Sequence, residues 1–294
     1  MLNLQPEVNR HLFDTEPFGF THELSGLPLF SMQRLRQLAF EYCDFPADYY
    51  VAVSAASAGQ QFYSGAPVTL KPHEAFDCLD TVPLRILLKR VDRHDREFSE
   101  LLRALFDEVV RFRGGLNGER VVRLESGLFI SSASSITPCH FDPEINFFAQ
   151  IAGEKTYHLF PPSAVSEDEM ERFYVAGAVN IAQVDLAKRD PSKEHVFVLN
   201  AGKGLHQPQN SPHWVRTGTD LSISYSFVFE TDASRATGRV RAYNRYLRRF
   251  GVQPTAVGAS PALDTLKQNT MKIVTPLRIG ARETLRKAFP WRAR

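Results

Sequence analysis

The sequence has no long hydrophobic run and little cysteine. No stretch of about 20 apolar residues occurs in its 294 residues, so we expect no membrane-spanning helix and no membrane partner. Residues 1–6 lack a charged segment followed by an apolar run, so a secretory signal is not expected. Three cysteines at long spacings, Cys43, Cys78 and Cys139, do not suggest a disulfide framework. A reducing, cytoplasmic location is the simplest prediction.

The composition is that of an ordinary globular protein, but the charge is unevenly distributed. Hydrophobic residues make up 43% and charged residues 23% of the chain, which is long enough to bury a sizeable core. Residues 235–294 hold fourteen Lys and Arg against two acids, Asp264 and Glu283, whereas the whole chain carries only +2. The sequence therefore combines an acidic body with a basic C-terminal segment.

Residues 1–120 are predicted to form an N-terminal α/β segment that packs on the part that follows. Ser31 and Asp95 each precede apolar residues at helical spacing, so both are predicted helix caps. Residues 49–54 read as a strand. Glycines at 114, 115 and 118 end the second helix, and we place a domain boundary at residue 120.

Residues 121–234 are predicted to form a mainly β domain. Short β-like runs recur there with little helix between them, which favours a barrel or a sandwich. They cover residues 121–132, 146–151, 155–160, 196–199 and 221–230. The Ala-Gly-Glu sequence at 152–154 predicts a hairpin turn between the second run and the third. Ser166 is expected to cap one short helix.

Residues 235–294 are predicted to form a basic helical segment. An apolar stripe runs along residues 240–250, with arginines on the opposite side. Ser260-Pro261 and Thr275-Pro276 each place a capping residue before a proline at the first helical position. We therefore expect three helices in this segment.

His140 and Asp142 lie two positions apart, and both are residues of types that bind metals. In an extended chain this spacing directs both side chains to one face. Two imidazoles and one carboxylate on one face of an octahedral ion leave three positions open, as in non-haem Fe(II) oxygenases. Taken alone the pattern is weak, because nine histidines in a chain with 33 acids produce about one such match by chance.

The residues around this pair carry a more specific pattern. The run from Thr137 to Lys155, TPCHFDPEINFFAQIAGEK, resembles the core of the Jumonji C family of Fe(II)- and 2-oxoglutarate-dependent oxygenases. It is most similar to the cupin-like branch that contains the asparaginyl hydroxylase of hypoxia-inducible factor. The resemblance covers roughly residues 121–230. It implies a double-stranded β-helix (jelly-roll) barrel of the cupin type, with the α/β elements before it and the helical segment after it.

The resemblance also implies a set of metal ligands. His140 and Asp142 match the proximal ligands, and His213, which precedes the run at 221–230, matches the distal histidine. His206 stands where the family usually has an aromatic residue and is the second choice for the third ligand. Two candidates remain. His158 is expected to be a packing residue, and His195 is expected to be exposed.

Four further residues fall at positions where the family binds its cosubstrate. Lys155 matches the lysine that holds the distal carboxylate of 2-oxoglutarate, and a buried dicarboxylate does require a fixed cation. Thr137 and Asn146 match polar contacts, and Ser226 replaces the usual asparagine. The segment 202–208 departs from the family pattern, with a lysine at 203 in place of an acid. No catalytic residue is implied beyond the metal site.

Together these features predict a dioxygenase that uses Fe(II), 2-oxoglutarate and O2 to hydroxylate an unidentified small molecule, protein or RNA. One alternative is a non-catalytic cupin-like module that binds a metal or ligand as a sensor or scaffold. Another is a hydroxylase directed to RNA by the basic segment, whose positive field would attract a polyanion. Members of the family often dimerise through C-terminal helices, so a homodimer through residues 235–294 is also expected.

Overall fold

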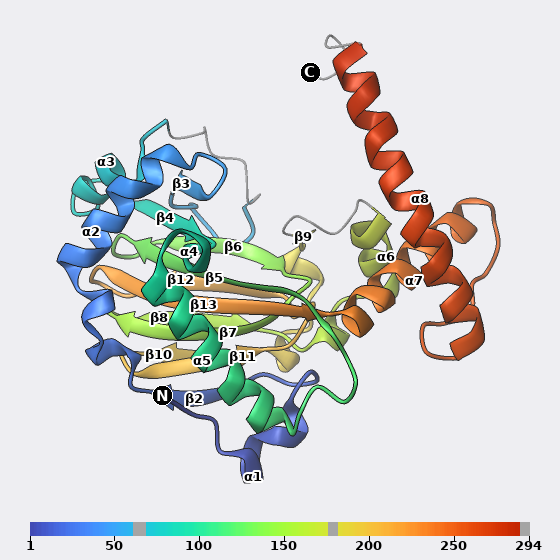
Figure 1. Ribbon diagram of the computed structural model, residues 1–294, viewed down its shortest axis with the longest axis horizontal. Coiled ribbons are helices and arrows are strands. Elements are labelled where there is room, and N and C mark those ends of the chain that lie inside the picture. The colour runs from blue at the N-terminus through green and yellow to red at the C-terminus, as the bar shows by residue number, and fades with distance from the viewer. Residues whose placement is uncertain (61–68, 176–181, 289–294) are drawn as a thin grey trace. The chain divides into compact units, whose positions relative to one another are not determined.

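The computed structural model describes residues 1–60, 69–175 and 182–288 (Figure 1). The chain forms two compact units. One joins Met1–Val165 with Ile181–Glu230 and contains the β-sheets, and the other joins Ser166–Asn180 with Thr231–Arg294 and is helical. The domain boundaries at residues 120 and 234 stay predictions.

The first unit is built on two antiparallel sheets. The larger has the strand order β1 (Leu2–Asn3), β2 (Phe18–His22), β11 (Lys203–Gln207), β7 (Ile145–Ala152), β13 (Ser222–Thr231), β5 (Val121–Ser131), β4 (Leu84–Lys89), β3 (Tyr49–Val53). The smaller has the order β10 (His195–Leu199), β8 (Lys155–Leu159), β12 (His213–Thr217), β6 (Ile136–Phe141), β9 (Ala182–Gln183). Mainly antiparallel sheets with flanking helices confirm the predicted fold class and are consistent with a jelly-roll.

Helices flank these sheets along the chain. In the first unit they are α1 (Pro6–Asn9), α2 (Met32–Glu41), α3 (Pro72–Asp77), α4 (Val91–His94) and α5 (Arg96–Arg113). The second unit has α6 (Glu167–Val175), α7 (Asp232–Arg249) and α8 (Pro261–Ala288). Short 3-10 helices cover Arg10–Leu12, Leu24–Gly26, Pro28–Phe30, Tyr42–Asp44, Pro162–Ala164, Leu186–Lys188 and Pro191–Lys193. The predicted caps are confirmed, because Ser31 and Asp95 both accept backbone N–H groups of the helices that follow them.

The main hydrophobic core lies between the larger sheet and its covering helices. Helix α5 runs across the sheet in Figure 1 and contributes Phe98, Leu102 and Leu105 to this core. On the facing strand β4, the residues at 84, 86 and 88 are buried and alternate with half-buried ones. This period of two leaves the other side of the larger sheet free to face the smaller one.

A second cluster fills the space between the two sheets. Phe148 and Leu205 of the larger sheet pack there with Tyr157, Leu159 and Val215 of the smaller. These residues define the interior of the barrel, and the strand positions that share their faces point into it. This interior is the part of the fold that positions the candidate site.

The hairpin predicted at residues 152–154 is wrong. Strand β7 pairs with β11 and β13 in the larger sheet, whereas β8 pairs with β10 and β12 in the smaller one. The turn therefore carries the chain from one sheet to the other. Gly153 has a positive φ of 67°, and a Cβ there would collide with the backbone of Leu221. A tight glycine turn is compatible with either connection, so local sequence did not distinguish them.

The prediction of three C-terminal helices is also wrong. Ser260 does precede a helix, but Pro276 lies inside α8 rather than at the start of a third helix. The apolar stripe predicted along residues 240–250 is only partly buried, since Val240 of α7 is buried whereas Phe250, directly after this helix, is 83% exposed. A proline inside a helix loses one backbone hydrogen bond, and α8 continues through it despite that cost.

The helices of the described ranges do not combine the length and the apolar composition needed to cross a bilayer.

All three cysteines are free. Cys139 is buried beside the predicted metal ligands in sequence, and burial raises the pKa of its thiol to about 12. It is therefore a small apolar packing residue at neutral pH.

His206 lies on the face of β11 opposite to the barrel interior. Leu205 points inward, so its neighbour His206 points into the main core. There its ring stacks on Phe13, with ring centroids 4.9 Å apart, and lies 4.7 Å from Phe18 and from Phe147. Neither ring nitrogen has a hydrogen-bond partner among the described residues. Burial lowers the pKa of His206 to about 3, which keeps the imidazole neutral.

Replacing His206 with Phe should reduce the loss of folding stability that occurs when the pH falls from 8 to 5. The unfolded chain takes up a proton below pH 6.5, whereas the folded protein does so only near pH 3. The stability linked to His206 is therefore full above pH 6.5 and falls by about 2 kcal/mol at pH 5. Urea unfolding between pH 8 and pH 5 measures this, with the exposed His195→Phe as control. Equal pH dependence in wild type and His206→Phe would contradict it.

Candidate metal centre

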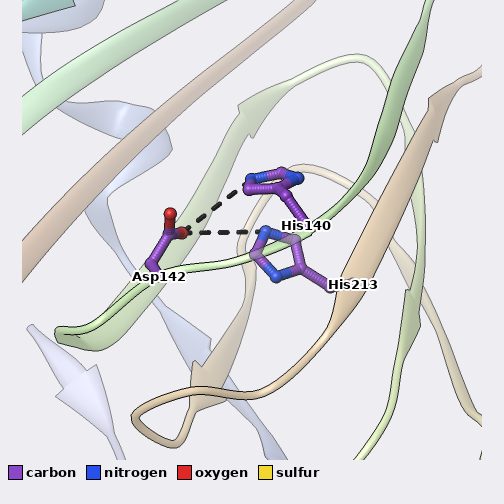
Figure 2. A group of neighbouring side chains, drawn as sticks. All are labelled: His140, Asp142 and His213. Carbon is purple, nitrogen blue, oxygen red and sulfur yellow. Dashed lines mark ion pairs between the residues drawn. The ribbon is translucent and has the colours of Figure 1, made fainter. Parts of the chain in front are cut away.

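Two neighbouring strands of the smaller sheet bring two histidines together. In the antiparallel register of β6 and β12, His140 lies directly opposite His213. Directly opposite residues on paired strands share one face of the sheet. Asp142 follows His140 by two positions and keeps its side chain on the same face. Figure 2 shows the three side chains pointing toward one another.

The three side chains face one another without pairing directly. Asp142 Oδ2 lies 3.9 Å from Nε2 of His140 and 3.9 Å from Nε2 of His213. One ligand atom from each residue lies within 4.8 Å of the others, and no second such group occurs in the described ranges. Separations of 3.9 Å exceed a hydrogen bond. A shared cation is the group that would join the three.

Backbone carbonyl groups orient both imidazoles. Nδ1 of His140 donates to the carbonyl oxygen of Pro138 over 2.7 Å, and Nδ1 of His213 donates to that of Ser211 over 3.1 Å. The proton thus belongs on Nδ1, and the lone pair of each Nε2 faces Asp142. Metal-ligating histidines are usually held in this way.

Burial sets the charge state of the three groups. It lowers the pKa of His140 to about 4 and, together with the proximity of His140, the pKa of His213 to about 3. It raises the pKa of the Asp142 carboxyl, although His213 and Arg123 act in the opposite direction. Two neutral imidazoles and one half-buried carboxyl group form no ion pair with a lysine or arginine among the described residues, and a divalent cation would supply the positive partner.

The donor set fits Fe(II). Two imidazole nitrogens and one carboxylate oxygen on one face are typical of non-haem iron sites, which keep further positions open for other ligands. A structural zinc site would instead close its shell with a fourth protein ligand, often a thiolate. Cys139 provides none, because its neighbour His140 points into the site and the alternation of β6 turns Cys139 to the other face.

Lys155 shares the barrel interior with the three ligands. It begins β8, in which Leu159 lies opposite His213, so Lys155 is on the same face about 13 Å farther along the strand. The side chain is buried, with its ammonium 5.6 Å from the ring centre of Phe129 and 5.3 Å from that of Phe148. Among the described residues, no carboxylate or other hydrogen-bond acceptor contacts it. An anionic ligand would compensate this buried cation.

Arg85 is a second cation in this region, and the sequence analysis missed it. Its Nη1 donates to Thr137 Oγ1 over 3.0 Å. Burial, and then the charge of Arg85, lower the pKa of Lys155 to about 7, so Arg85 lies within electrostatic range of that amine. The alternating sequence LRILLK at 84–89 could have revealed both the strand and the outlying arginine.

The two other predicted cosubstrate residues form a separate pair. Ser226 Oγ donates to Asn146 Oδ1 over 2.7 Å, and both side chains are buried. No hydrogen bond among the described residues joins this pair to Lys155 or Thr137. The structure thus joins Arg85 to Thr137 within electrostatic range of Lys155, and joins Asn146 to Ser226 by a separate hydrogen bond.

The remaining candidate histidines lie away from Asp142. His158 stacks on Trp214, with ring centroids 3.7 Å apart, and its Nδ1 is 3.1 Å from Glu194, which confirms a packing role. His195 is exposed, as expected. His206 points into the main core and not toward the interior that holds the triad.

A family model described as a cupin-like domain matches residues 70–234, more than half of the chain. HSPB1-associated protein 1 from Bos taurus is 30% identical over 143 residues, which are 45% of this chain and 28% of that protein. Lysine-specific demethylase JMJ30 from Arabidopsis thaliana is 32% identical over 113 residues, 36% of this chain and 26% of that protein. The chain therefore spans less than a third of the length of these relatives.

Solved structures with the same fold include that of Escherichia coli YcfD, with a TM-score of 0.54 and 17% identity. A second YcfD structure, a ribosomal oxygenase in complex with cobalt and 2-oxoglutarate, has a TM-score of 0.50 and 16% identity. Each match covers 94% of this chain and 68% of the other. At this identity the likeness is one of fold.

Replacing His213 with Ala should weaken Mn(II) binding by about 100-fold or more, because even the partners that orient a ligand are worth about 10–100-fold. His140→Ala should have a similar effect. His158→Ala is the matched control, since this histidine packs on Trp214 outside the triad. Isothermal titration of Mn(II) into each protein measures the effect. If His213→Ala and His158→Ala bind equally well, His213 is not a ligand.

Proposed function

The chain belongs to the cupin-like domain family, and on that premise we propose that it is an Fe(II)- and 2-oxoglutarate-dependent oxygenase that hydroxylates a substrate C–H bond. The observation that carries the proposal is the buried Lys155, which has no counter-ion among the described residues and lies in the same interior as His140, Asp142 and His213. A simple metal site needs no such lysine, whereas a dicarboxylate cosubstrate does.

In this proposal the protein's own residues hold and orient the reactants. Nε2 of His140, Nε2 of His213 and a carboxylate oxygen of Asp142 hold Fe(II). When bound, Fe(II) and 2-oxoglutarate supply the oxidative chemistry, in which O2 is consumed, succinate and CO2 form and a substrate C–H becomes C–OH. The ammonium of Lys155 pairs with the far carboxylate. Arg85, which donates a hydrogen bond to Thr137, adds a second positive charge near Lys155.

The apolar residues between the sheets support this arrangement. Tyr157 stacks on His213, with ring centroids 5.9 Å apart, and packs edge-on against Phe148 at 4.8 Å. Rings packed around the site exclude water, which strengthens the attraction between Lys155 and an anion. The Escherichia coli neighbour in complex with cobalt and 2-oxoglutarate supports assigning the same pair of ligands to this fold.

The non-catalytic sensor or scaffold remains the second candidate function. A module that only binds a metal has no use for a buried lysine with a half-buried arginine within electrostatic range of it. Lys155 and Arg85 therefore favour the oxygenase, and turnover distinguishes the two candidates.

Protein purified without O2 and then given Fe(II), 2-oxoglutarate, O2 and candidate substrates should form succinate. His140→Ala should form none above background, because one ligand of the ion is lost. Succinate is measured by mass spectrometry or NMR. Wild-type protein that binds the metal tightly but forms no more succinate than His140→Ala would favour the non-catalytic module.

The affinity for 2-oxoglutarate should fall as pH rises above 7. Burial and Arg85 lower the pKa of Lys155 to about 7, so the free protein loses the required positive charge above that pH. Binding must then take up a proton, which weakens it about tenfold per pH unit.

Lys155→Arg is the matched variant for this test, because a guanidinium stays protonated across the range. The dissociation constant of 2-oxoglutarate is measured from pH 7 to pH 9 with Mn(II) in place of Fe(II). Lys155→Arg should show little pH dependence. A flat profile in the wild type as well would exclude Lys155 as the carboxylate partner.

Among the substrates that the sequence allows, RNA receives little support from helix α7. Arg241 pairs with Glu167 at 2.9 Å, Arg245 with Asp168 at 2.7 Å and Arg248 with Glu171 at 2.8 Å. These arginines of α7 neutralise the acidic helix α6, so they are not available as a free basic face. We therefore favour a small molecule or a protein as the substrate.

We also propose that the protein forms a homodimer through α8. Leu266, Ile273 and Leu277 are exposed by more than half and recur at helical spacing on one face. A second copy of the helix would cover this face, and a monomeric mass in light scattering would remove the proposal.

A reducing, cytoplasmic setting is likewise proposed, in keeping with the three free cysteines.

A further inference from the structure

The last residue of β11, Gln207, faces the interior that holds the candidate metal centre. Leu205, two positions earlier, packs in the cluster between the two sheets, and the alternation of the strand places Gln207 on the same face. In the register with β7, Gln207 lies opposite Asn146. The sequence analysis assigned Gln207 no role.

The carboxamide of Gln207 is completely buried. The exposed fraction of the residue is 0%, and neither Oε1 nor Nε2 has a partner at full hydrogen-bond geometry in the described part of the chain, although the amide is close enough to interact with the Asp142 carboxyl group. An unpaired buried amide costs about 1–3 kcal/mol, so such groups are rare unless a ligand or a function accounts for them. The burial of this amide therefore points to a ligand or a function at the site.

Gln207 lies beside Asp142. Its amide is close enough to help lower the pKa of the Asp142 carboxyl, after burial, His213 and Arg123. Oδ2 of Asp142 is the oxygen that faces both imidazoles, at 3.9 Å from each Nε2. The other carboxylate oxygen is thus the acceptor that remains for an amide N–H.

The loop that follows Gln207 holds the backbone around Asp142 in place. The backbone N–H of Asn210 donates to the carbonyl oxygen of Asp142 over 2.9 Å, and Gln209 Nε2 donates to that of Pro143 over 2.7 Å. These bonds fix the main chain around Asp142. A hydrogen bond at the carboxylate would in addition set the rotation of its side chain.

We propose that Gln207 is a positioning residue of the metal centre, whose Nε2–H donates to the carboxylate oxygen of Asp142 that does not bind the ion and turns the other oxygen toward His140 and His213. The inference rests on the proposed metal centre. It accounts for the buried amide, because its cost in stability is offset by a carboxylate held ready for the ion. Residues that orient a metal ligand in this way are worth about 10–100-fold in affinity.

Gln150 provides a matched control in the same sheet. It is also a fully buried glutamine, but its Nε2 donates to Ala152 O and Ser222 Oγ, and its Oε1 accepts from Ser224 Oγ. Replacing Gln150 with Leu breaks three hydrogen bonds, whereas replacing Gln207 with Leu removes an amide whose proposed partner is the Asp142 carboxylate alone. Gln207→Leu should therefore weaken metal binding with little loss of stability, whereas Gln150→Leu should lower stability and leave metal binding unchanged.

The experiment measures Mn(II) affinity by titration and the thermal stability of the metal-free protein. Gln207→Leu should bind Mn(II) about 10–100-fold more weakly while melting at the same or a higher temperature than the wild type. Gln150→Leu should melt at a lower temperature and keep its affinity. Gln207→Met, which matches the original side chain in length, should reproduce Gln207→Leu and serves if that variant does not fold. The absorption spectrum of bound Co(II) should also change in the Gln207 variants.

The outcomes separate this inference from the proposed function. Wild-type protein that binds no Mn(II) contradicts the metal centre itself. Wild-type and Gln207 variants that bind Mn(II) equally, with the same Co(II) spectrum, overturn the positioning role alone. A loss of affinity that is matched by an equal loss in Gln150→Leu would also overturn it, since the effect would then be a general one of repacking.

Discussion

The direct pairing of His140 with His213 across two antiparallel strands is the constraint on which the candidate site depends. The register of such a pair has a period of two, so a slip of one residue would turn one imidazole to the opposite face. Strand β12 is bonded on both sides, to β6 and to β8, which resists such a slip. Because the pairing with β8 also sets which of its residues point inward, the same strand places Lys155 in the interior that holds the histidines.

The interior holds a carboxyl group and an amine whose pKa values are both shifted toward the neutral form. Burial raises the pKa of Asp142 at one place and lowers that of Lys155 at another, and Arg85 adds to the second effect. Isolated buried charges lower stability, and they occur mostly where a ligand supplies the missing partner. Gln207 has the same character in neutral form, since its amide is buried without a partner at full hydrogen-bond geometry among the described residues. These groups share one explanation, which is that the folded chain is complementary to a cation and an anion bound together.

Local signals in the sequence predicted the individual elements better than their connections. The caps at Ser31 and Asp95 depend on residues a few positions away, and both form as expected. The turn at 152–154 and the Thr275-Pro276 pair were each compatible with two structures, and distant packing selected the other one. Arg85 was missed for a related reason, because its role depends on which strand lies opposite β4.

The sequence by itself determined that His140 and Asp142 share a face, because a spacing of two in a strand does so regardless of the rest of the fold. It also marked Lys155 as a candidate through the resemblance of its surroundings to a family. Only the tertiary structure decided that His213 faces Asp142 while His206 is buried among Phe rings, and that Lys155 has no counter-ion in the part of the chain that the structure describes. Spacing along the chain sets the side of a strand on which a residue lies. The pairing of strands far apart in sequence sets what that side faces.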